Sequence, residues 1–290
     1  MRAERTTHDQ RTRRERPTVT TLRKLHGLGN DFLVTFDLSE EIDAVEFARS
    51  VCDRRRGIGA DGLLIGSAPA LDQPSGVDVV MRLLNADGSP AEMSGNGIRC
   101  FAQAWIEHRG AAVPSTVAVA TDAGLRTVEI RSHDGTTMVS SVEMGEVSDT
   151  HEPADWAKTG CHPDRPVRHL SLGNPHAVVG VDDVAVVDLE ALGSVVPGVN
   201  LEIVEPGPGP HEVRMRVHER GVGITEACGT GACATAVAAL EWGLVTADAN
   251  GEVTVHMDGG TVTVSVDRGT RTAVLSGPSV AVATVEIEPR

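Results

Sequence analysis

The sequence predicts an α/β protein built from two similar halves, and two observations carry this prediction. First, residues 213–240 predict a strand, a polar glycine-rich loop and an apolar helix, with Gly-x-Gly where the helix begins. Second, residues 79–102 repeat this order of elements. The small residue before Gly-x-Gly is Cys228 in one copy and Ser94 in the other, and a polar residue stands nine positions earlier in both. The shared register indicates two helix N-termini that face each other.

Cys228 is expected within the first turn of its helix, where the environment is electropositive. Free backbone N–H groups and about half a unit of positive charge favour an anion there. We therefore expect the pKa of the thiol to fall from ~8.5 toward roughly 3.5–7.5. Gly229 and Gly231 leave the N–H groups uncovered, so a substrate carboxylate fits beside the sulfur. Tight helix packing also explains Gly-x-Gly, but the repeat at matching register favours a site.

The remaining elements follow from the apolar pattern, taken in chain order. Residues 1–17 are rich in arginine and nearly free of apolar side chains, which predicts disorder and no secretory signal. Residues 44–53 have helical spacing, and the helix after Ser94 is expected to end near Gly110. Residues 206–210 alternate Pro and Gly and predict a rigid turn between two strands. Alternating or β-branched runs predict further strands at 19–35, 63–65, 117–120, 125–130, 138–142, 253–255, 262–266, 273–275 and 280–287.

Composition and charge exclude several classes of function. Hydrophobic residues make up 40% of the 290 residues, enough for two domains with cores of their own. Aromatic residues make up 2%, tyrosine is absent and the net charge is −15, so no nucleic-acid partner is expected. No stretch reaches the ~18 apolar residues of a membrane span. The five cysteines have neither disulfide-framework nor zinc-site spacing, which indicates a reducing cytoplasm and no metal.

Several separated motifs resemble those of the diaminopimelate epimerase family, which interconverts LL- and meso-diaminopimelate for lysine and peptidoglycan biosynthesis without a cofactor. The resemblance runs from about residue 22 to the end of the chain. It rests on the motifs GNDF (29–32), GIGADG (57–62), NADGS (85–89), SGNG (94–97), GNPH (173–176), GVN (198–200), ERG (219–221) and ACGTG (227–231).

The resemblance implies a fold of two pseudo-symmetric halves. Each half would be a curled, mostly antiparallel β-sheet or barrel around a central α-helix, with the substrate in the cleft between them. The implied halves span 18–138 and 139–277, and the strand 278–288 would return to the first half.

The family's chemistry depends on two cysteines that work as an acid and base pair. One thiolate removes the α-proton, and the other thiol delivers a proton to the opposite face. The resemblance places Cys228 at one of these positions and Ser94 at the other. A hydroxyl holds its proton far more strongly than a thiol, so we expect impaired two-base activity. Glu219 and His176 resemble residues that adjust the proton affinity of the pair.

The resemblance also implies which residues hold the substrate. The backbone N–H groups of Gly95, Asn96, Gly229 and Thr230 would receive the carboxylate at the reacting carbon. Amide side chains donate and accept, and arginine grips a carboxylate, which suits an amino-acid end. A single loop asparagine usually serves a turn, so only the combined pattern supports these roles. The side chains implied for the remainder of the substrate are Asn30, Asn85, Asn174, Asn200, Glu219 and Arg220.

The sequence thus predicts a cytoplasmic, cofactor-free isomerase of diaminopimelate that forms a homodimer, as the family suggests. Three explanations for Ser94 stay open: an engineered Cys→Ser substitution, a natural variant with one-sided chemistry, or a paralogue that has lost activity. The alternative functions are a related amino-acid racemase, a one-base lyase of the same fold, and a non-catalytic amino-acid-binding paralogue.

Overall fold

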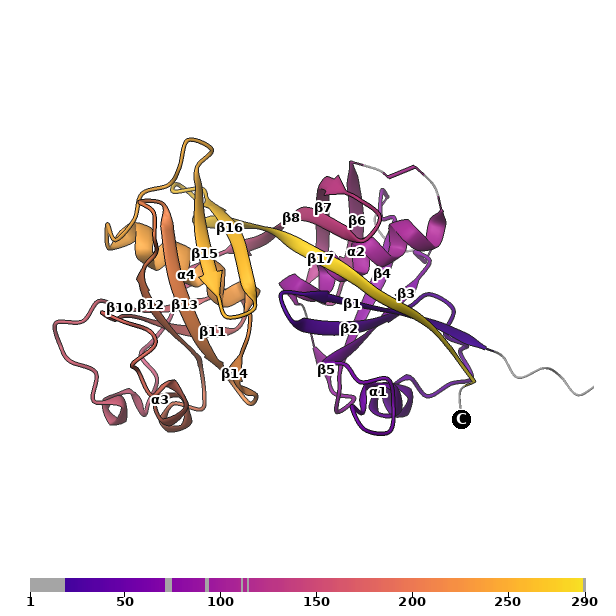
Figure 1. Ribbon diagram of the computed structural model, residues 1–290, viewed down its shortest axis with the longest axis horizontal. Helices are drawn as coiled ribbons and strands as arrows, with labels where there is room; N and C mark the ends of the chain where they lie inside the picture. Colours follow the sequence, from indigo (N-terminus) through magenta and orange to yellow (C-terminus); the bar gives the residue numbers. More distant parts are fainter. Residues whose placement is uncertain (1–18, 71–74, 92–93, 111, 114, 289–290) are drawn as a thin grey trace, which may run out of the picture.

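The computed structural model describes residues 19–70, 75–91, 94–110, 112–113 and 115–288, and the predicted disordered tail 1–17 lies outside them. The chain forms two lobes side by side, each a curled sheet around one central helix (Figure 1). The central helices are α2 (Gly95–Arg109) and α4 (Gly229–Glu241). Within the described residues, no helix has the length and apolar character needed to cross a membrane. The predicted architecture of two pseudo-symmetric α/β halves is confirmed.

The first lobe contains eight strands and a short outer helix. Its outer helix α1 (Ala44–Cys52) begins after Asp43, whose side chain accepts hydrogen bonds from the first-turn N–H groups. The helix matches the prediction for 44–53. The strands are β1 (Thr20–Gly27), β2 (Asn30–Thr35), β3 (Gly62–Ser67), β4 (Val79–Asn85), β5 (Pro90–Ala91), β6 (Thr116–Thr121), β7 (Gly124–His133) and β8 (Thr137–Glu146).

The second lobe repeats this arrangement and adds the longest strand of the chain. Residues 206–210 lead from β12 into β13, as predicted. The short helices are η1 (Trp156–Thr159) and α3 (Leu189–Val195). The strands are β9 (Ser148–Asp149), β10 (Val167–Ser171), β11 (Pro175–Gly180), β12 (Asn200–Pro206), β13 (Glu212–Glu219), β14 (Gly223–Thr225), β15 (Glu252–Met257), β16 (Gly260–Val266) and β17 (Thr272–Ile287).

Equivalent strands pair in the same way in both lobes. Strand β2 is parallel to β3, with Phe32 opposite Gly62, and β11 is parallel to β12, with His176 opposite Asn200. Strand β4 then pairs with β3 antiparallel and with β6 parallel, as β13 does with β12 and β15. Because the backbone pairing is the same, each strand position in one lobe has an equivalent position in the other, whatever its side chain.

Strand β17 crosses from the second lobe to the first (Figure 1), and it is continuous where two strands were predicted. It pairs with β16 through residue Ser276, with β8 along most of its length, and with β1 from Val280 onward. Gly277 and Pro278 were expected to separate strands 273–275 and 280–287, and this prediction is wrong. At Pro278 the strand has β8 on one side and changes partner on the other, so the missing N–H of proline breaks no ladder.

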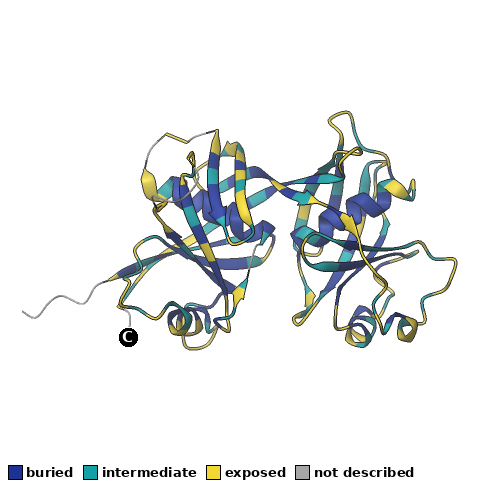
Figure 2. Cartoon of the chain, turned by 180° about the vertical axis from the view of Figure 1, so that it is seen from behind, coloured by how far each residue is buried: buried dark blue, intermediate teal, exposed yellow. Residues whose placement is uncertain are grey.

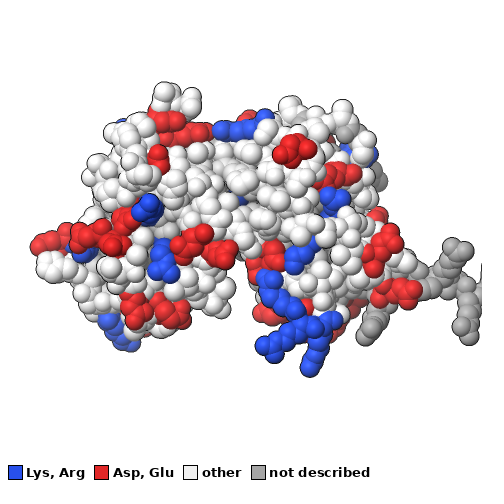
Figure 3. Space-filling view, viewed as in Figure 1, with Lys and Arg blue, Asp and Glu red and all other residues white. Residues whose placement is uncertain are grey.

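The core surrounds the two central helices, which are buried along most of their length (Figure 2). In α4 the buried side chains are mainly alanine, which lets the sheet close tightly around the helix. Helix α2 ends at Gly110, whose φ of 59° is left-handed, as the predicted helix end requires. The acidic side chains, in contrast, are scattered over both lobes on the face shown in Figure 3.

Candidate active site

The two predicted helix N-termini meet between the lobes. Ser94 caps α2, because its Oγ accepts a hydrogen bond from the N–H of Gly97 at 3.0 Å. Cys228 caps α4, because its Sγ accepts from the N–H of Gly231 at 3.3 Å. A Cβ atom on Gly229 would lie 3.5 Å from the Cα of Gly95, so the first turns of the two helices are in close contact. Cys228 therefore stands just before its helix, rather than within the first turn as we expected.

Cys228 is linked to a chain of polar groups in the second lobe. Its Sγ lies 3.5 Å from Oγ1 of Thr230, which accepts a hydrogen bond from Nδ2 of Asn174 at 3.2 Å. The Asn174 Oδ1 lies 3.1 Å from Nε2 of His176, and Nδ1 of His176 lies 2.6 Å from Oε1 of Glu202. His176 and Glu202 are fully buried. The structure thus brings three predicted residues together with Cys228 and adds Glu202, which the sequence interpretation missed.

Glu202 also lies close to the thiol. A Cβ atom on Gly231 would be 2.6 Å from Oε1 of Glu202 and 3.2 Å from Sγ of Cys228, so glycine is needed there. A signal for Glu202 was present in the sequence, since it is a charged residue in the otherwise apolar stretch 201–204. Burial raises the pKa of Glu202 above its ordinary value, against the opposing effect of His176.

The expected low pKa of the Cys228 thiol is not found, and this prediction is corrected. Burial raises the pKa well above the ordinary value, and the carboxylates of Glu219 and Glu202 raise it further. The hydrogen bonds from Gly231 and Thr230 oppose this shift but are outweighed. The helix N-terminus was visible in the sequence, whereas the two carboxylates and the burial depend on the fold. At neutral pH Cys228 is therefore a thiol, which can donate a proton.

Glu219 lies at the end of β13 and is a second carboxyl group with a raised pKa. Burial is the largest cause, and hydrogen bonding with Thr225, whose Oγ1 donates to the Glu219 carboxylate, opposes it. Because the Glu219 charge raises the pKa of the thiol, the two groups interact electrostatically. A carboxyl group with a raised pKa beside a thiol is suited to receive its proton.

The surroundings of Ser94 are apolar by comparison. A Cβ atom on Gly97 would lie 3.4 Å from Cζ of Phe32, which occupies the strand position equivalent to His176. Leu64 is the third residue of β3, and Glu202 is the third residue of β12, so the two positions are equivalent. Asn85, at the position of Glu219, is exposed and donates from Nδ2 to Oγ of Ser89 at 3.0 Å. The first lobe therefore offers Ser94 no titratable partner at these three positions.

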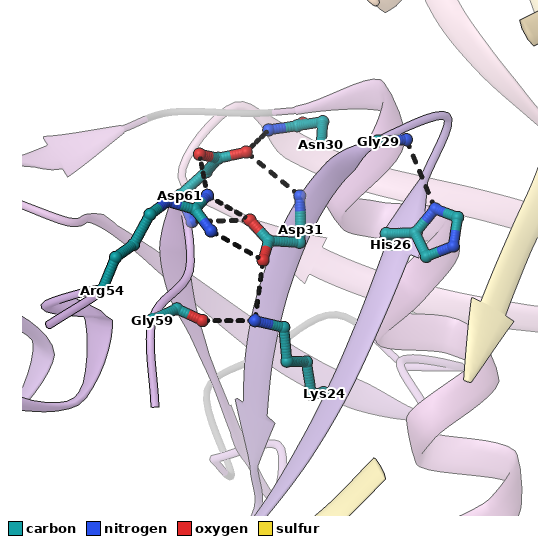
Figure 4. A network of polar contacts seen from close by, with 8 residues as sticks. All are labelled: Lys24, His26, Gly29, Asn30, Asp31, Arg54, Gly59 and Asp61. Atoms are coloured by element: carbon teal, nitrogen blue, oxygen red, sulfur yellow. Dashed lines mark hydrogen bonds and ion pairs between the residues drawn. The ribbon is translucent and has the colours of Figure 1, made fainter. Parts of the chain in front are cut away.

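Asn30 belongs to a polar network in the first lobe (Figure 4), and its neighbour Asn96 lies in the first turn of α2. Asn30 donates from Nδ2 to Oδ2 of Asp61 at 2.7 Å, and its Oδ1 lies 3.5 Å from Nδ2 of Asn96. Arg54 bridges Asp61, at 2.8 Å, and Asp31, at 2.6 Å. Through the hydrogen bond to Asp61, the network holds the Asn30 side chain in one orientation. The sequence interpretation assigned no role in the site to Asp61 or Arg54.

The side chains of Asn200 and Arg220, both expected to contact the substrate, differ in their surroundings. The Asn200 Oδ1 accepts from the backbone N–H of Arg220 at 2.9 Å, and its Nδ2 donates to the Pro175 carbonyl at 3.2 Å. Asn200 thus joins three chain segments at the site. The Arg220 guanidinium is exposed and forms no ion pair with the residues that the structure describes. It is available to a ligand carboxylate.

A cavity of about 340 Å³ lies elsewhere in the second lobe, between η1, α3 and the strands β11 and β12. Its lining includes Trp156, Cys161 and Leu192. None of the residues predicted for the site lines this cavity. The site at the helix N-termini is therefore distinct from this cavity.

Comparison with known proteins identifies relatives of this chain. A family model described as diaminopimelate epimerase matches residues 22–149 and 169–282. A diaminopimelate epimerase from Moorella thermoacetica is 38% identical over 279 residues, which cover 89% of this chain and 96% of the relative. A diaminopimelate epimerase from Streptomyces coelicolor is 37% identical, with 91% of this chain and 94% of the relative covered.

Solved structures of more distant proteins share the fold. A Bacillus anthracis phenazine biosynthesis protein of the PhzF family superposes with a TM-score of 0.69 at 16% identity, covering 93% of this chain and 99% of that one. A hydroxyproline epimerase from Agrobacterium vitis, with bound trans-4-hydroxy-L-proline, gives 0.63 at 16% identity, with coverage of 93% and 91%. At this identity the likeness establishes the two-lobed fold alone.

Proposed function

Because this chain belongs to the diaminopimelate epimerase family, we propose that it binds diaminopimelate and transfers protons at its α-carbon without a cofactor. The observation that carries the proposal is the meeting of two helix N-termini, one capped by Cys228 and one by Ser94. Backbone N–H groups of Gly95, Asn96 and the equivalent residues Gly229 and Thr230 are the donors for the carboxylate at the reacting carbon. The α-carbon then lies between the thiol and the hydroxyl.

Cys228 serves one face of the α-carbon. Its raised pKa makes the thiol the resting form. To act as a base it must first pass its proton to a neighbour. Glu219, a neighbouring carboxyl group with a raised pKa, is the receiving group that the geometry supports. His176 holds Asn174 and Glu202 in place beside the thiol. The α-proton then moves to the thiolate. The electron pair left on the α-carbon delocalises into the substrate carboxylate, whose oxygens accept hydrogen bonds from the backbone N–H groups.

Ser94 serves the opposite face poorly. At the two described strand positions equivalent to His176 and Glu202, the first lobe has Phe32 and Leu64, neither of which can act as a base for the serine hydroxyl. We propose that this form exchanges the α-proton from the Cys228 side and rarely completes inversion. A lyase of the same fold would use the same single thiol and lose a leaving group, whereas a binding paralogue would exchange no proton.

The rest of the proposal concerns recognition and assembly. Asn30, Asn85, Asn174, Asn200 and Arg220 surround the distal amino-acid end of the substrate, with Arg220 as its carboxylate partner. The protein acts as a cytoplasmic homodimer, as the family suggests. The halves divide near residue 139, and the pairing of β17 with β1 supports the return of residues 278–288 to the first half.

The test is the rate of LL- to meso-diaminopimelate conversion by the unmodified chain and by Ser94→Cys, in reducing buffer without added cofactor. A second acid–base group contributes roughly 10²–10⁴-fold, so we expect Ser94→Cys to be faster by that factor. Ser94→Ala is the matched control, because it removes the hydroxyl without supplying a thiol. Fast turnover by the unmodified chain would contradict the role given to Ser94, and no turnover by Ser94→Cys would contradict the substrate.

A further inference from the structure

Arg99 is a fully buried cation on α2, one turn after the helix N-terminus. Its side chain is 0% exposed, and burial lowers its pKa to about 10, so it keeps its charge at neutral pH. No carboxylate among the described residues forms an ion pair with it. A buried arginine without an acidic partner is costly, since desolvation of the charge is not repaid by a counter-ion. Such a cost indicates a function rather than a contribution to stability.

The guanidinium contacts the residues that are expected to bind the substrate carboxylate. Its Nη1 donates to the carbonyl of Gly95 at 2.8 Å, and its Nη2 donates to Oδ1 of Asn96 at 2.6 Å. The Gly95 carbonyl and the Asn96 N–H belong to the same peptide group. A charged donor on that carbonyl polarises the peptide and strengthens its N–H as a donor.

Glycines on the two paired strands β1 and β17 leave space for the guanidinium. A Cβ atom on Gly27 of β1 or on Gly277 of β17 would lie 3.4 Å from Nη2 of Arg99. Because the guanidinium is fully buried, its charge acts on the neighbouring peptide groups with little screening by solvent. The Nε atom has no hydrogen-bond partner in the described structure, so the guanidinium is not held by a complete set of protein acceptors.

Arg99 also sets the direction of the neighbouring amides. Because it donates to Oδ1 of Asn96, the Nδ2 of Asn96 turns toward Oδ1 of Asn30, at 3.5 Å. The Nδ2 of Asn30 in turn donates to Asp61 (Figure 4). The second lobe has no equivalent, since Cys233 stands on α4 where Arg99 stands on α2.

We propose that Arg99 is a positioning residue whose buried positive charge strengthens carboxylate binding at the joined helix N-termini. The proposal rests on the proposed function, because it takes diaminopimelate as the ligand. It predicts that a neutral residue at this position weakens binding without loss of stability. A purely structural arginine would show the opposite, since its removal would lower the unfolding temperature.

The experiment measures diaminopimelate binding by calorimetry and thermal unfolding for the unmodified chain, Arg99→Met and Arg99→Lys at one salt concentration. We expect Arg99→Met to raise Kd by roughly ten- to a hundredfold, the range for hydrogen bonds to charged groups. Its unfolding midpoint should stay the same or rise. Arg99→Lys keeps the charge and should stay within about fivefold of the unmodified Kd. Arg109→Met is the matched control, since it removes a charge from the exposed end of the same helix.

Each outcome decides the proposal. Unchanged binding by a folded Arg99→Met would overturn it, as would equal weakening by Arg99→Lys. If Arg99→Met does not fold, Arg99→Gln replaces it, because glutamine keeps an amide donor for Gly95 while it lacks the charge. If neither neutral variant folds, Arg99 is structural and the proposal is wrong. If the unmodified chain binds no diaminopimelate, the failure lies with the proposed function instead.

Discussion

The two lobes have equivalent strands and equivalent helix N-termini, but they differ in the side chains at equivalent positions around the two caps. At the strand positions beside the cap, the second lobe has titratable groups and the first lobe has apolar or neutral ones, while the first lobe carries a charged residue, Arg99, on its helix. The equivalent pairs are Phe32 and His176, Leu64 and Glu202, Asn85 and Glu219, Ser94 and Cys228, and Arg99 and Cys233. The duplicated backbone thus supplies N–H donors from both lobes, while the titratable groups around the cap are concentrated in the second lobe and a buried arginine in the first.

The largest expected effect comes from removing the thiol of the second lobe. Cys228→Ala should reduce the exchange of the α-proton of diaminopimelate with solvent deuterium by roughly 10²–10⁴-fold, because the remaining cap is a hydroxyl. Exchange is followed by mass spectrometry of the recovered substrate. Ser94→Ala should change this exchange far less. Equal losses from the two variants would mean that the lobes are chemically equivalent after all.

The second prediction compares the stability effects of alanine at the glycines three residues after each cap, Gly97 and Gly231. Gly231→Ala forces a Cβ atom to 2.6 Å from Oε1 of Glu202 and should lower the free energy of unfolding by about 1–3 kcal/mol. Gly97→Ala meets Cβ of Ser94 at 3.1 Å, and the gain in helix propensity, about 1 kcal/mol, offsets much of the cost. Urea unfolding of both variants measures the difference. A larger loss from Gly97→Ala would contradict the tighter packing of the second cap.

A thiol introduced by Ser94→Cys should react faster than Cys228. The helix N-terminus lowers its pKa, and the described positions equivalent to Glu202 and Glu219 hold no carboxylate, whereas burial and two carboxylates raise the pKa of Cys228. At neutral pH a larger thiolate fraction should give alkylation by iodoacetamide at least about tenfold faster. Both rates should rise with pH, and the introduced thiol should level off at the lower pH. Peptide mass spectrometry separates the two, and Cys233, whose pKa burial raises to about 12, is the unreactive control.

The smallest effect expected is that of a single charge beside Cys228. Glu219→Gln removes a carboxylate that raises the pKa of the thiol, so the pKa should fall and thiolate should form at lower pH. The pH at which alkylation of Cys228 reaches half its maximal rate should decrease, with rates at neutral pH up to a few-fold higher. Glu226→Gln, at an exposed position just before the helix, is the control. An upward shift would show that Glu219 acts chiefly by hydrogen bonding.

Local sequence patterns predicted the backbone of the site but not its electrostatics. The repeat around Ser94 and Cys228 identified both helix N-termini, because helix starts depend on nearby residues. Glu202 escaped because its partner His176 is 26 residues away and meets it only across a parallel strand pair. The wrong direction for the pKa of Cys228 has the same origin, since burial and charge neighbours are tertiary properties. The break expected at Pro278 failed because the partner change there depends on distant strands.

Strand β17 is made late in the chain but belongs partly to the first lobe, so it affects when that lobe can finish folding. The first lobe receives one of its strands from residues 280–287, and Arg23 bonds to Thr284 across a separation of 261 residues. The ribosome makes β17 after all the other strands of the two lobes, so β1 has β2 as a partner but lacks β17 until the second lobe has been synthesised. This late strand thus makes completion of the first lobe depend on synthesis of the second.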